Sequence, residues 1–196
     1  MRSFLDTDRF DFNLTPDSLV IDGGCYRGQW ARAISEKYRC HIHSFEPCTK
    51  WYEEAGRVLK EYPKVTLLNA GLGASMRKVD FGVQNDSTGM FAKGMPQEGG
   101  TFEHETVQII DGVAYVRSLG QKVDLLKLNI EGSEFEFLEH VLAEDAASLF
   151  RTIIVQPHMN APNYEFRWRR IQERLSHTHE LVAAVLFVWE KWEIRA

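Results

Sequence analysis

Three polar side chains stand where three successive predicted strands end, and their chemistry matches the parts of a nucleoside. Asp22, Glu46 and Asn69 each follow a short apolar run. A carboxylate accepts hydrogen bonds from ribose hydroxyls, and an amide pairs with the edge of a purine. Each residue alone also fits a solvated strand end or a turn. Together they predict a nucleoside-binding site.

A glycine-rich loop follows Asp22. Gly23, Gly24 and Gly28 allow the backbone to approach a ligand, and the loop leads into a predicted helix whose N-terminus would face that ligand. The dinucleotide fingerprint G-x-G-x-x-G is absent, which disfavours a nicotinamide oxidoreductase. A carboxylate at Asp22 would repel a pyrophosphate and favours the amino group of a cationic amino-acid ligand. A plain tight turn is the alternative for the loop alone.

The spacing of apolar residues predicts the elements that position these side chains. Runs predict strands at 19–22, 40–45, 65–68, 123–129 and 152–155, and residues three or four apart predict helices between them. Alternating strands and helices imply a parallel sheet with right-handed crossovers. The final runs, 181–188 and 189–195, are joined too tightly for a crossover helix. They predict a hairpin, and hence an antiparallel strand at the edge of the sheet. Thr49 and Asp111 are the predicted caps of the helices that begin beside them.

Two stretches lack this regularity. Residues 1–18 predict a lead-in segment before the first strand. Residues 74–110 are rich in glycine, with short strands predicted around 79–83 and 106–110, and they predict an insertion over the active site that sets acceptor specificity. We expect residues 1–196 to form a single domain around one site.

Composition narrows the class of protein. The chain has 196 residues, 44% of them hydrophobic and 26% charged, which is typical of a globular domain. A net charge of -5 disfavours contact with a phosphate backbone, so we expect no nucleic acid partner. Three cysteines without a C-x-x-C spacing indicate a reduced, cytoplasmic location. The longest apolar run, 181–189, is far shorter than the roughly 20 residues that span a bilayer, so we expect no membrane contact.

Four motifs resemble those of the FkbM family of S-adenosylmethionine-dependent methyltransferases. In chain order they are Asp22-x-Gly24-x-x-x-Gly28-Gln29, Phe45-Glu46-Pro47, Asn69-Ala70-x-x-Gly73 and Leu126-Lys127-Leu128-Asn129-Ile130-Glu131-Gly132-Ser133-Glu134. The resemblance implies an α/β fold of the Rossmann-like class I methyltransferases. Such a fold has a mostly parallel seven-stranded sheet, helices on both faces and an antiparallel final strand. It also implies O-methylation of a hydroxyl on a sugar, a glycan or a secondary metabolite.

The implied cofactor is S-adenosyl-L-methionine. The residues expected to bind it are Asp22, Gly23, Gly24, Gly28, Glu46, Pro47, Asn69, Ala70 and Asn129. With this cofactor, the amino group near Asp22 would belong to the methionine part, and the ribose would lie at Glu46.

A second polar group is expected around the methyl group that is transferred. Because the strands ending at Asp22 and Asn129 should be neighbours at the topological switch of the sheet, the residues just beyond them should surround that methyl group. These residues are Glu131, Glu134 and His158. His158 is the expected general base because its ordinary pKa lies closest to neutrality, and Glu131 would balance the sulfonium or orient the acceptor. Glu134 also suits the first turn of a helix, and His158 also suits a structural turn.

Asn129 and Gln156 depart from the family pattern, which usually has Asp at the first position and often Glu at the second. Neutral amides are poor ligands for a divalent ion, so we expect no metal. They also keep open an alternative function, a non-catalytic S-adenosylmethionine-binding module with a methyltransferase fold. The expected partners are a small-molecule or glycan acceptor and a second copy of the chain. A homo-oligomer would help to cover the site, because the chain leaves little room for an acceptor domain.

Overall fold

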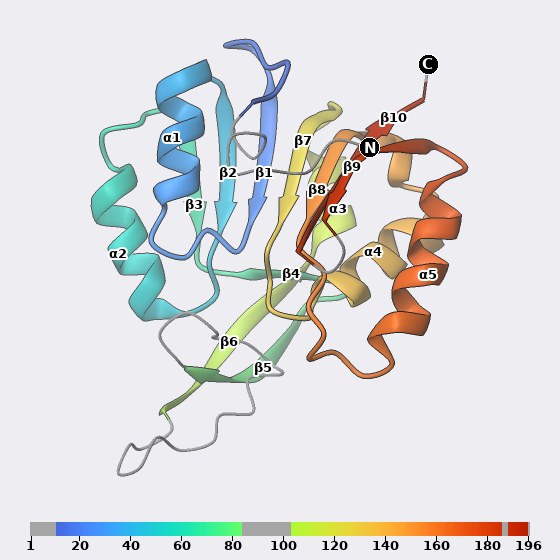
Figure 1. The fold of residues 1–196 in the computed structure, drawn as a ribbon. Coiled ribbons are helices and arrows are strands. Elements are labelled where there is room, and N and C mark those ends of the chain that lie inside the picture. Colours follow the sequence, from blue (N-terminus) through green and yellow to red (C-terminus); the bar gives the residue numbers. More distant parts are fainter. Residues whose placement is uncertain (1–10, 84–102, 186–187, 196) are drawn as a thin grey trace.

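The computed structural model describes residues 11–83, 103–185 and 188–195, and a seven-stranded sheet runs through it (Figure 1). In spatial order the strands are β3 (Val65–Leu68), β2 (His41–Phe45), β1 (Leu19–Gly23), β7 (Val123–Leu128), β8 (Phe150–Val155), β10 (Trp189–Ile194) and β9 (His179–Val185). The first five are mutually parallel. The chain reverses its strand order between β1 and β7, which places the topological switch there.

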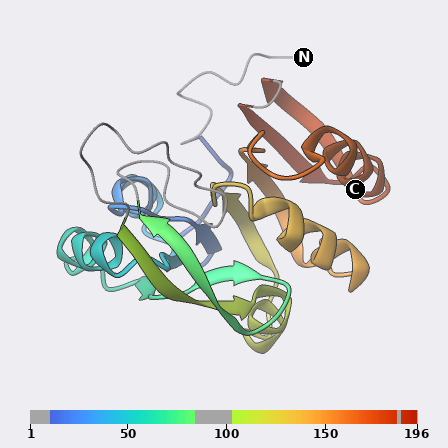
Figure 2. The ribbon, with the colours of Figure 1, turned by 90° about the horizontal axis from the view of Figure 1, so that it is seen from below.

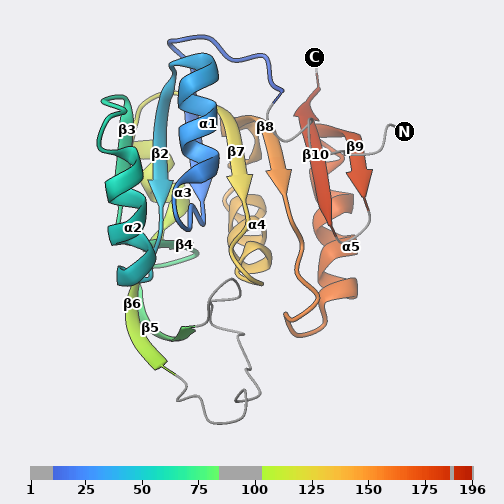
Figure 3. The same ribbon diagram turned by 60° about the vertical axis from the view of Figure 1, so that its left-hand side comes forward.

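Helices cover both faces of this sheet (Figure 3). One face carries α1 (Gln29–Tyr38) and α2 (Thr49–Leu59), and the other carries α3 (Gly112–Ser118), α4 (Glu134–Ala143) and α5 (Tyr164–Leu175). A short 3-10 helix, η1 (Ala147–Leu149), precedes β8. The mostly parallel α/β fold with helices on both faces is therefore confirmed.

Apolar side chains alternate between the two faces, which explains why the central strands read as continuous apolar runs. On β1, Val20 packs in one core cluster with Ile34 of α1. Its neighbour Ile21 packs in the other cluster with Phe135 of α4 and Trp168 of α5. Burial on both sides fixes the register of β1 between β2 and β7.

The C-terminal hairpin forms as predicted, and its final strand β10 is antiparallel to both β8 and β9. As predicted, an antiparallel strand of the hairpin lies at the edge of the sheet: it is β9, which pairs with β10, while β10 takes the inner position beside β8. The reason is burial. Trp189, Glu190 and Trp192 of β10 are nearly inaccessible to solvent, and an inner strand buries them better than an edge would.

A second sheet lies across the carboxyl ends of the main strands, as the view from below shows (Figure 2). It contains β4 (Gly71–Gly73), β6 (Glu103–Asp111) and β5 (Arg77–Val83) in that order. The short strands predicted around 79–83 and 106–110 are confirmed and are longer than expected. The rest of the predicted insertion, residues 84–102, lies outside the described residues.

One of the two predicted helix caps is correct. The side chain of Asp111 accepts a hydrogen bond from the backbone N–H of Ala114 at the start of α3. Thr49 is instead the first residue of α2, and the capping position falls on Cys48 without a side-chain cap. The Thr49 hydroxyl and backbone N–H both donate to the carboxylate of Glu105 on β6. Thr49 therefore ties α2 to the second sheet.

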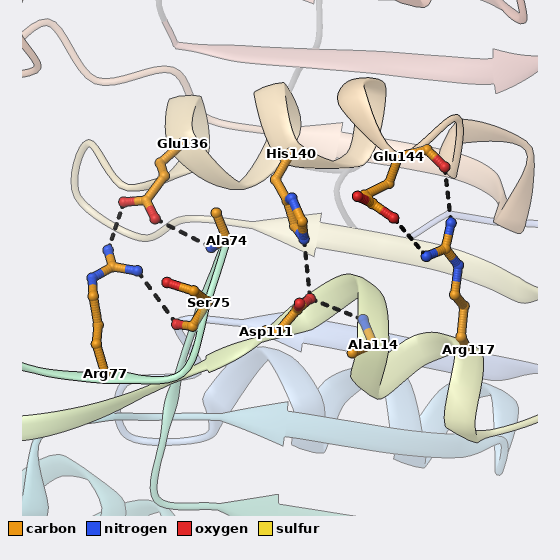
Figure 4. A network of polar contacts seen from close by, with 9 residues as sticks. All are labelled: Ala74, Ser75, Arg77, Asp111, Ala114, Arg117, Glu136, His140 and Glu144. Atoms are coloured by element: carbon orange, nitrogen blue, oxygen red, sulfur yellow. Dashed lines mark hydrogen bonds and ion pairs between the residues drawn. The ribbon is translucent and has the colours of Figure 1, made fainter.

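Polar contacts fasten the second sheet and α3 to one side of α4 (Figure 4). Glu136, His140 and Glu144 follow one another at four-residue spacing, which places them on the same side of the helix. Glu136 binds Arg77 and the backbone of Ala74. His140 contacts Asp111, and Glu144 pairs with Arg117. The helix α4 is thus held from the side by residues of the second sheet and of α3.

Candidate cofactor and methyl-transfer site

A pocket of about 280 Å³ lies between the carboxyl ends of β1, β2 and β7 and the second sheet. Its lining residues are Gly24, Tyr26, Glu46, Pro47, Trp51, Gly71, Leu72, Phe81, Ile109, Asn129, Ile130, Glu131 and Ser133. This volume is near the lower end of the range for small-molecule sites. The position is the one expected for a ligand at the topological switch of an open α/β sheet.

The glycine loop approaches β7 closely at Gly24. Gly24 has φ +75°, and a Cβ atom there would lie 2.0 Å from the carbonyl oxygen of Asn129. Any side chain would therefore force the loop away from β7. Gly28 has φ +79° and packs against Leu59 of α2, outside the pocket, while Gly23 is the last residue of β1. Of the three predicted glycines, only Gly24 lines the pocket.

Asp22 does not reach the pocket. Its side chain is fully buried, and Oδ1 lies 2.8 Å from Nζ of Lys127 on the neighbouring strand. The same ammonium group donates to the carbonyl oxygens of Gly24 (2.6 Å) and Gly23 (3.2 Å). Asp22 and Lys127 therefore support the glycine loop from below. Sequence reasoning missed Lys127, although a charge inside a buried strand signals a need for a partner.

Glu46 lies at the pocket wall with its carboxylate held by two backbone groups. Oε2 accepts from the N–H of Tyr26 (2.9 Å), and Oε1 accepts from the N–H of Cys48 (3.0 Å). Burial raises the pKa of Glu46 from 4.5 to about 7, against the lowering effect of these two hydrogen bonds. Each oxygen keeps a lone pair for a ligand, so the group can accept hydrogen bonds from a diol.

Asn69 supports the loop beside Glu46. Its side-chain amide donates to the carbonyl oxygens of Glu46 and Pro47, both at 3.0 Å. Neither Asn69 nor Ala70 lines the pocket, whereas the next two residues, Gly71 and Leu72, do. The structure therefore brings Pro47 and the backbone beyond Ala70 to the site, and leaves the Asn69 side chain outside it.

Two buried polar atoms of the pocket wall have no partner among the described residues. They are Oδ1 of Asn129, at the end of β7, and Oγ of Ser133, just before α4. Leaving such atoms unpaired costs free energy, so a pocket that contains them suits a polar ligand. Asn129 was predicted at this site, and Ser133 was not.

Part of the pocket lining is apolar. Leu72, Phe81 and Ile109 come from the three strands of the second sheet, and Trp51 comes from α2. The Trp51 side chain is buried, with the Tyr26 ring centroid 4.6 Å away. An apolar wall of this kind suits the face of a heterocyclic base.

His158 lies between the two predicted carboxylates. Its Nδ1 is 3.1 Å from Oε1 of Glu134, and its Nε2 is 3.4 Å from Oε1 of Glu131. Glu134 is fully buried and also accepts from the backbone N–H groups of His158 (2.7 Å) and Gly132 (2.9 Å). Glu131 has φ +54° and is the member of the group that lines the pocket. The three residues predicted around the reacting group are thus brought together.

The charge of His158 follows from this arrangement. Burial of the ring lowers the pKa of His158. The hydrogen bonds to Glu131 and Glu134 outweigh this effect and raise the pKa to about 10. The ring is therefore an imidazolium near neutral pH. In that state it holds a proton on each nitrogen and cannot accept another, which favours a positioning role over the expected role of base.

The described residues contain no group of three or more His, Cys, Asp or Glu side chains arranged to hold a metal ion. They also contain no helix with the length and apolar character needed to cross a membrane.

This sheet order and this pocket define the class I, Rossmann-like methyltransferases. The chain belongs to the FkbM methyltransferase family, because the model of the methyltransferase FkbM domain matches residues 22–188. None of the curated proteins matches the chain.

Solved structures support the fold. The FkbM methyltransferase from Methylobacillus flagellatus KT has a TM-score of 0.61 at 11% identity, over 99% of this chain and 48% of that one. The chain thus spans about half the length of that protein. An rRNA methylase from Streptococcus thermophilus has a TM-score of 0.55 at 9% identity, and the match covers 100% of this chain and 98% of that one. The precorrin-6y C5,15-methyltransferase from Geobacter metallireducens GS-15 has a TM-score of 0.55 at 12% identity, and the match covers 96% of this chain and 84% of that one.

The prediction that nucleic acid is excluded as a partner is wrong. The fold is shared with rRNA methylases, over nearly the full length of both chains in the Streptococcus thermophilus case. Net charge describes the whole surface and does not report the local charge where a substrate docks. A total of -5 therefore does not exclude nucleic acid.

Proposed function

We propose that the chain binds S-adenosylmethionine in this pocket and transfers its methyl group to a hydroxyl of a sugar, a glycan or a secondary metabolite. The observation that carries the proposal is the pair of hydrogen-bond acceptors that the pocket wall offers to a ligand. Glu46 presents a fixed carboxylate, and Asn129 presents an unpaired buried oxygen. The nucleoside and amino-acid ends of this cofactor satisfy both.

The wall residues suit the three parts of the cofactor. Glu46 would accept hydrogen bonds from the ribose hydroxyls. Oδ1 of Asn129, next to Gly24, would accept from the ammonium group, a role that Asp22 leaves vacant because Lys127 engages its carboxylate. The apolar wall around Phe81 would contact the adenine.

The cofactor supplies an electrophilic methyl group, so the chain has to align an acceptor oxygen with it and receive a proton. Glu131 is the ionisable side chain of the Glu131–His158–Glu134 group that lines the pocket. We assign the proton to its carboxylate. His158 and Glu134 act through Glu131 as positioning residues, because the imidazolium holds the Glu131 carboxylate in place.

A second candidate is the non-catalytic cofactor-binding module, and the neutral amides of Asn129 and Gln156 favour it. In that case the pocket binds the cofactor without a reaction.

The class of acceptor is a separate question. A ribose hydroxyl in RNA has the same chemistry as a sugar hydroxyl, so RNA belongs among the acceptors to be tested.

The experiment is transfer of a labelled methyl group to a panel of glycans, polyols, phenolic metabolites and structured RNA. We expect label in a hydroxyl-bearing acceptor, and loss of transfer in Glu131→Gln while S-adenosylhomocysteine still binds. Glu139→Gln is the matched control, since Glu139 lies on α4 outside the pocket and pairs with Arg167. Cofactor binding without transfer to any acceptor would favour the module, and label found only in RNA would replace the proposed acceptor.

A further inference from the structure

The Glu131–His158–Glu134 group carries one net negative charge on geometric grounds. Both ring nitrogens of His158 face carboxylate oxygens, Nδ1 at 3.1 Å and Nε2 at 3.4 Å. A neutral imidazole has a single N–H, so it cannot donate to both carboxylates at once. The ring is therefore protonated, and two carboxylates with one imidazolium leave a charge of minus one.

Of the two carboxylates, Glu131 is the one that faces the pocket. Glu134 is fully buried, and its oxygens are occupied by His158 and by the N–H of Gly132. Glu131 lines the pocket and makes the longer contact with the imidazolium.

No positive side chain on the described pocket wall offsets this charge. Lys, Arg and His are absent from the residues that line the described pocket, whereas Glu46 and Glu131 are both present. The buried Lys127 has its own counter-charge in Asp22. The pocket therefore favours a cation over a neutral group of the same shape.

The proposed function brings the cofactor sulfur into the pocket that Glu131 lines. In the proposed function the ribose lies at Glu46 and the amino-acid end lies at Gly24 and Asn129. The sulfur joins those two parts, so it lies between them. Glu131 is two residues beyond Asn129 and lines the same pocket.

We infer that Glu131 makes the pocket discriminate by charge between the methyl donor, whose sulfur is a sulfonium, and the demethylated product, whose sulfur is neutral. This inference rests on the proposed function. In the transfer, the carbon–sulfur bond breaks, its electron pair stays on sulfur, and the methyl carbon bonds to the acceptor oxygen. The hydroxyl proton goes to Glu131. Both charges are then lost together, and the attraction that holds the donor no longer holds the product.

The test compares three ligands by calorimetric titration: S-adenosylmethionine, S-adenosylhomocysteine and sinefungin, in which an amine-bearing carbon replaces the methylated sulfur. In Glu131→Gln we expect the affinity for the two cations to fall about tenfold, with S-adenosylhomocysteine within about twofold of wild type. Glu139→Gln, which removes a charge from α4 outside the pocket, should leave all three affinities unchanged. Thermal melts confirm that each variant is folded.

Equal losses for the three ligands in Glu131→Gln, or no loss for any, would overturn the inference. Absence of binding by the wild type would instead overturn the proposed function, so the two failures are distinguishable. If Glu131→Gln does not fold, the wild type carries the test at low and high ionic strength. Added salt should then weaken the two cations more than S-adenosylhomocysteine, and an equal effect contradicts the inference.

Discussion

Lys127 and Asp22 lie directly opposite each other on β7 and β1, with Nζ 2.8 Å from Oδ1, and both side chains are buried. The lysine also donates to the two glycine carbonyls that follow Asp22. The glycine loop therefore depends on a buried ion pair beneath it. The pair links the strand on each side of the topological switch to the loop that would hold the cofactor.

Removal of one partner of this pair should be more damaging than removal of both. Lys127→Met leaves the Asp22 carboxylate buried without a cation, and we expect a loss of roughly 3–5 kcal/mol in the free energy of unfolding. Asp22→Asn combined with Lys127→Met should lose less, because no uncompensated charge remains. Urea denaturation of the three proteins measures this, and equal losses in the single and double variants would contradict it.

Cofactor binding should strengthen with pH through Glu46. Its pKa is raised to about 7, so the carboxyl is mostly protonated at pH 6 and mostly ionised at pH 8. Ribose hydroxyls donate to the ionised form, and we expect the affinity for S-adenosylhomocysteine to rise by up to about tenfold over this range, with release of a proton. Titration in buffers of different ionisation enthalpy measures both effects.

Glu46→Gln is the control for that pH dependence, since its side chain does not titrate. The affinity of this variant should not change with pH. A pH profile equal to that of wild type would show that a group other than Glu46 causes the effect.

The raised pKa of Glu46 also has a consequence for folding. The folded state holds this proton more tightly than the unfolded state, so the stabilising contribution is complete below pH 4.5 and is lost as the pH rises through about 7.

His158 should remain protonated across the neutral range. Its pKa is raised to about 10, while burial lowers the pKa of His43 and of His179. At pH 8 the NMR signals of His43 and His179 should be those of neutral rings, and His158 should show an imidazolium. Its contribution to stability is present below pH 6.5 and lost as the pH rises through about 10. The signal missing from His158→Gln provides the assignment, and a midpoint near 6.5 would refute the charged state.

Glu136 should control the docking of the second sheet on α4. Its carboxylate accepts from the N–H of Ala74 (3.2 Å) and pairs with Arg77 (2.6 Å). We expect Glu136→Ala to speed amide exchange over residues 70–78 about fivefold, with a loss of at most about 1 kcal/mol in overall stability. Glu144→Ala breaks the Arg117 pair at the other end of α4 and is the control. Exchange over 70–78 that responds equally to both variants would disprove this role.

The sequence predicted most of the fold because apolar periodicity reports burial directly. The run Val123–Leu128 is buried on both faces of the sheet, and this is why it reads as one apolar strand. Periodicity does not report the order of strands within a sheet. It predicted the final hairpin correctly, but the placement of β9 at the edge follows from the burial of Trp189 and Trp192, which is a tertiary effect.

Site residues that follow the end of a strand were predictable from the sequence. Those whose place at the pocket depends on a tertiary contact were less so. Glu46 and Asn129 lie at the pocket because the ends of parallel strands meet at one edge. Asp22 lies next to the end of a strand too, but Lys127 holds its side chain inside. Phe81 and Ile109 reach the pocket through the second sheet, and no local spacing links those residues to β1 or β2.

Calorimetric titration of S-adenosylhomocysteine tests the central claim most directly. We predict one binding site per chain in the wild type and at least about tenfold weaker binding in Glu46→Ala, because the ribose hydroxyls lose their acceptor. Glu53→Ala, which removes an exposed carboxylate from α2, should bind like wild type. No binding by the wild type, or equal binding by Glu46→Ala and wild type, would contradict the assignment of this pocket to the cofactor.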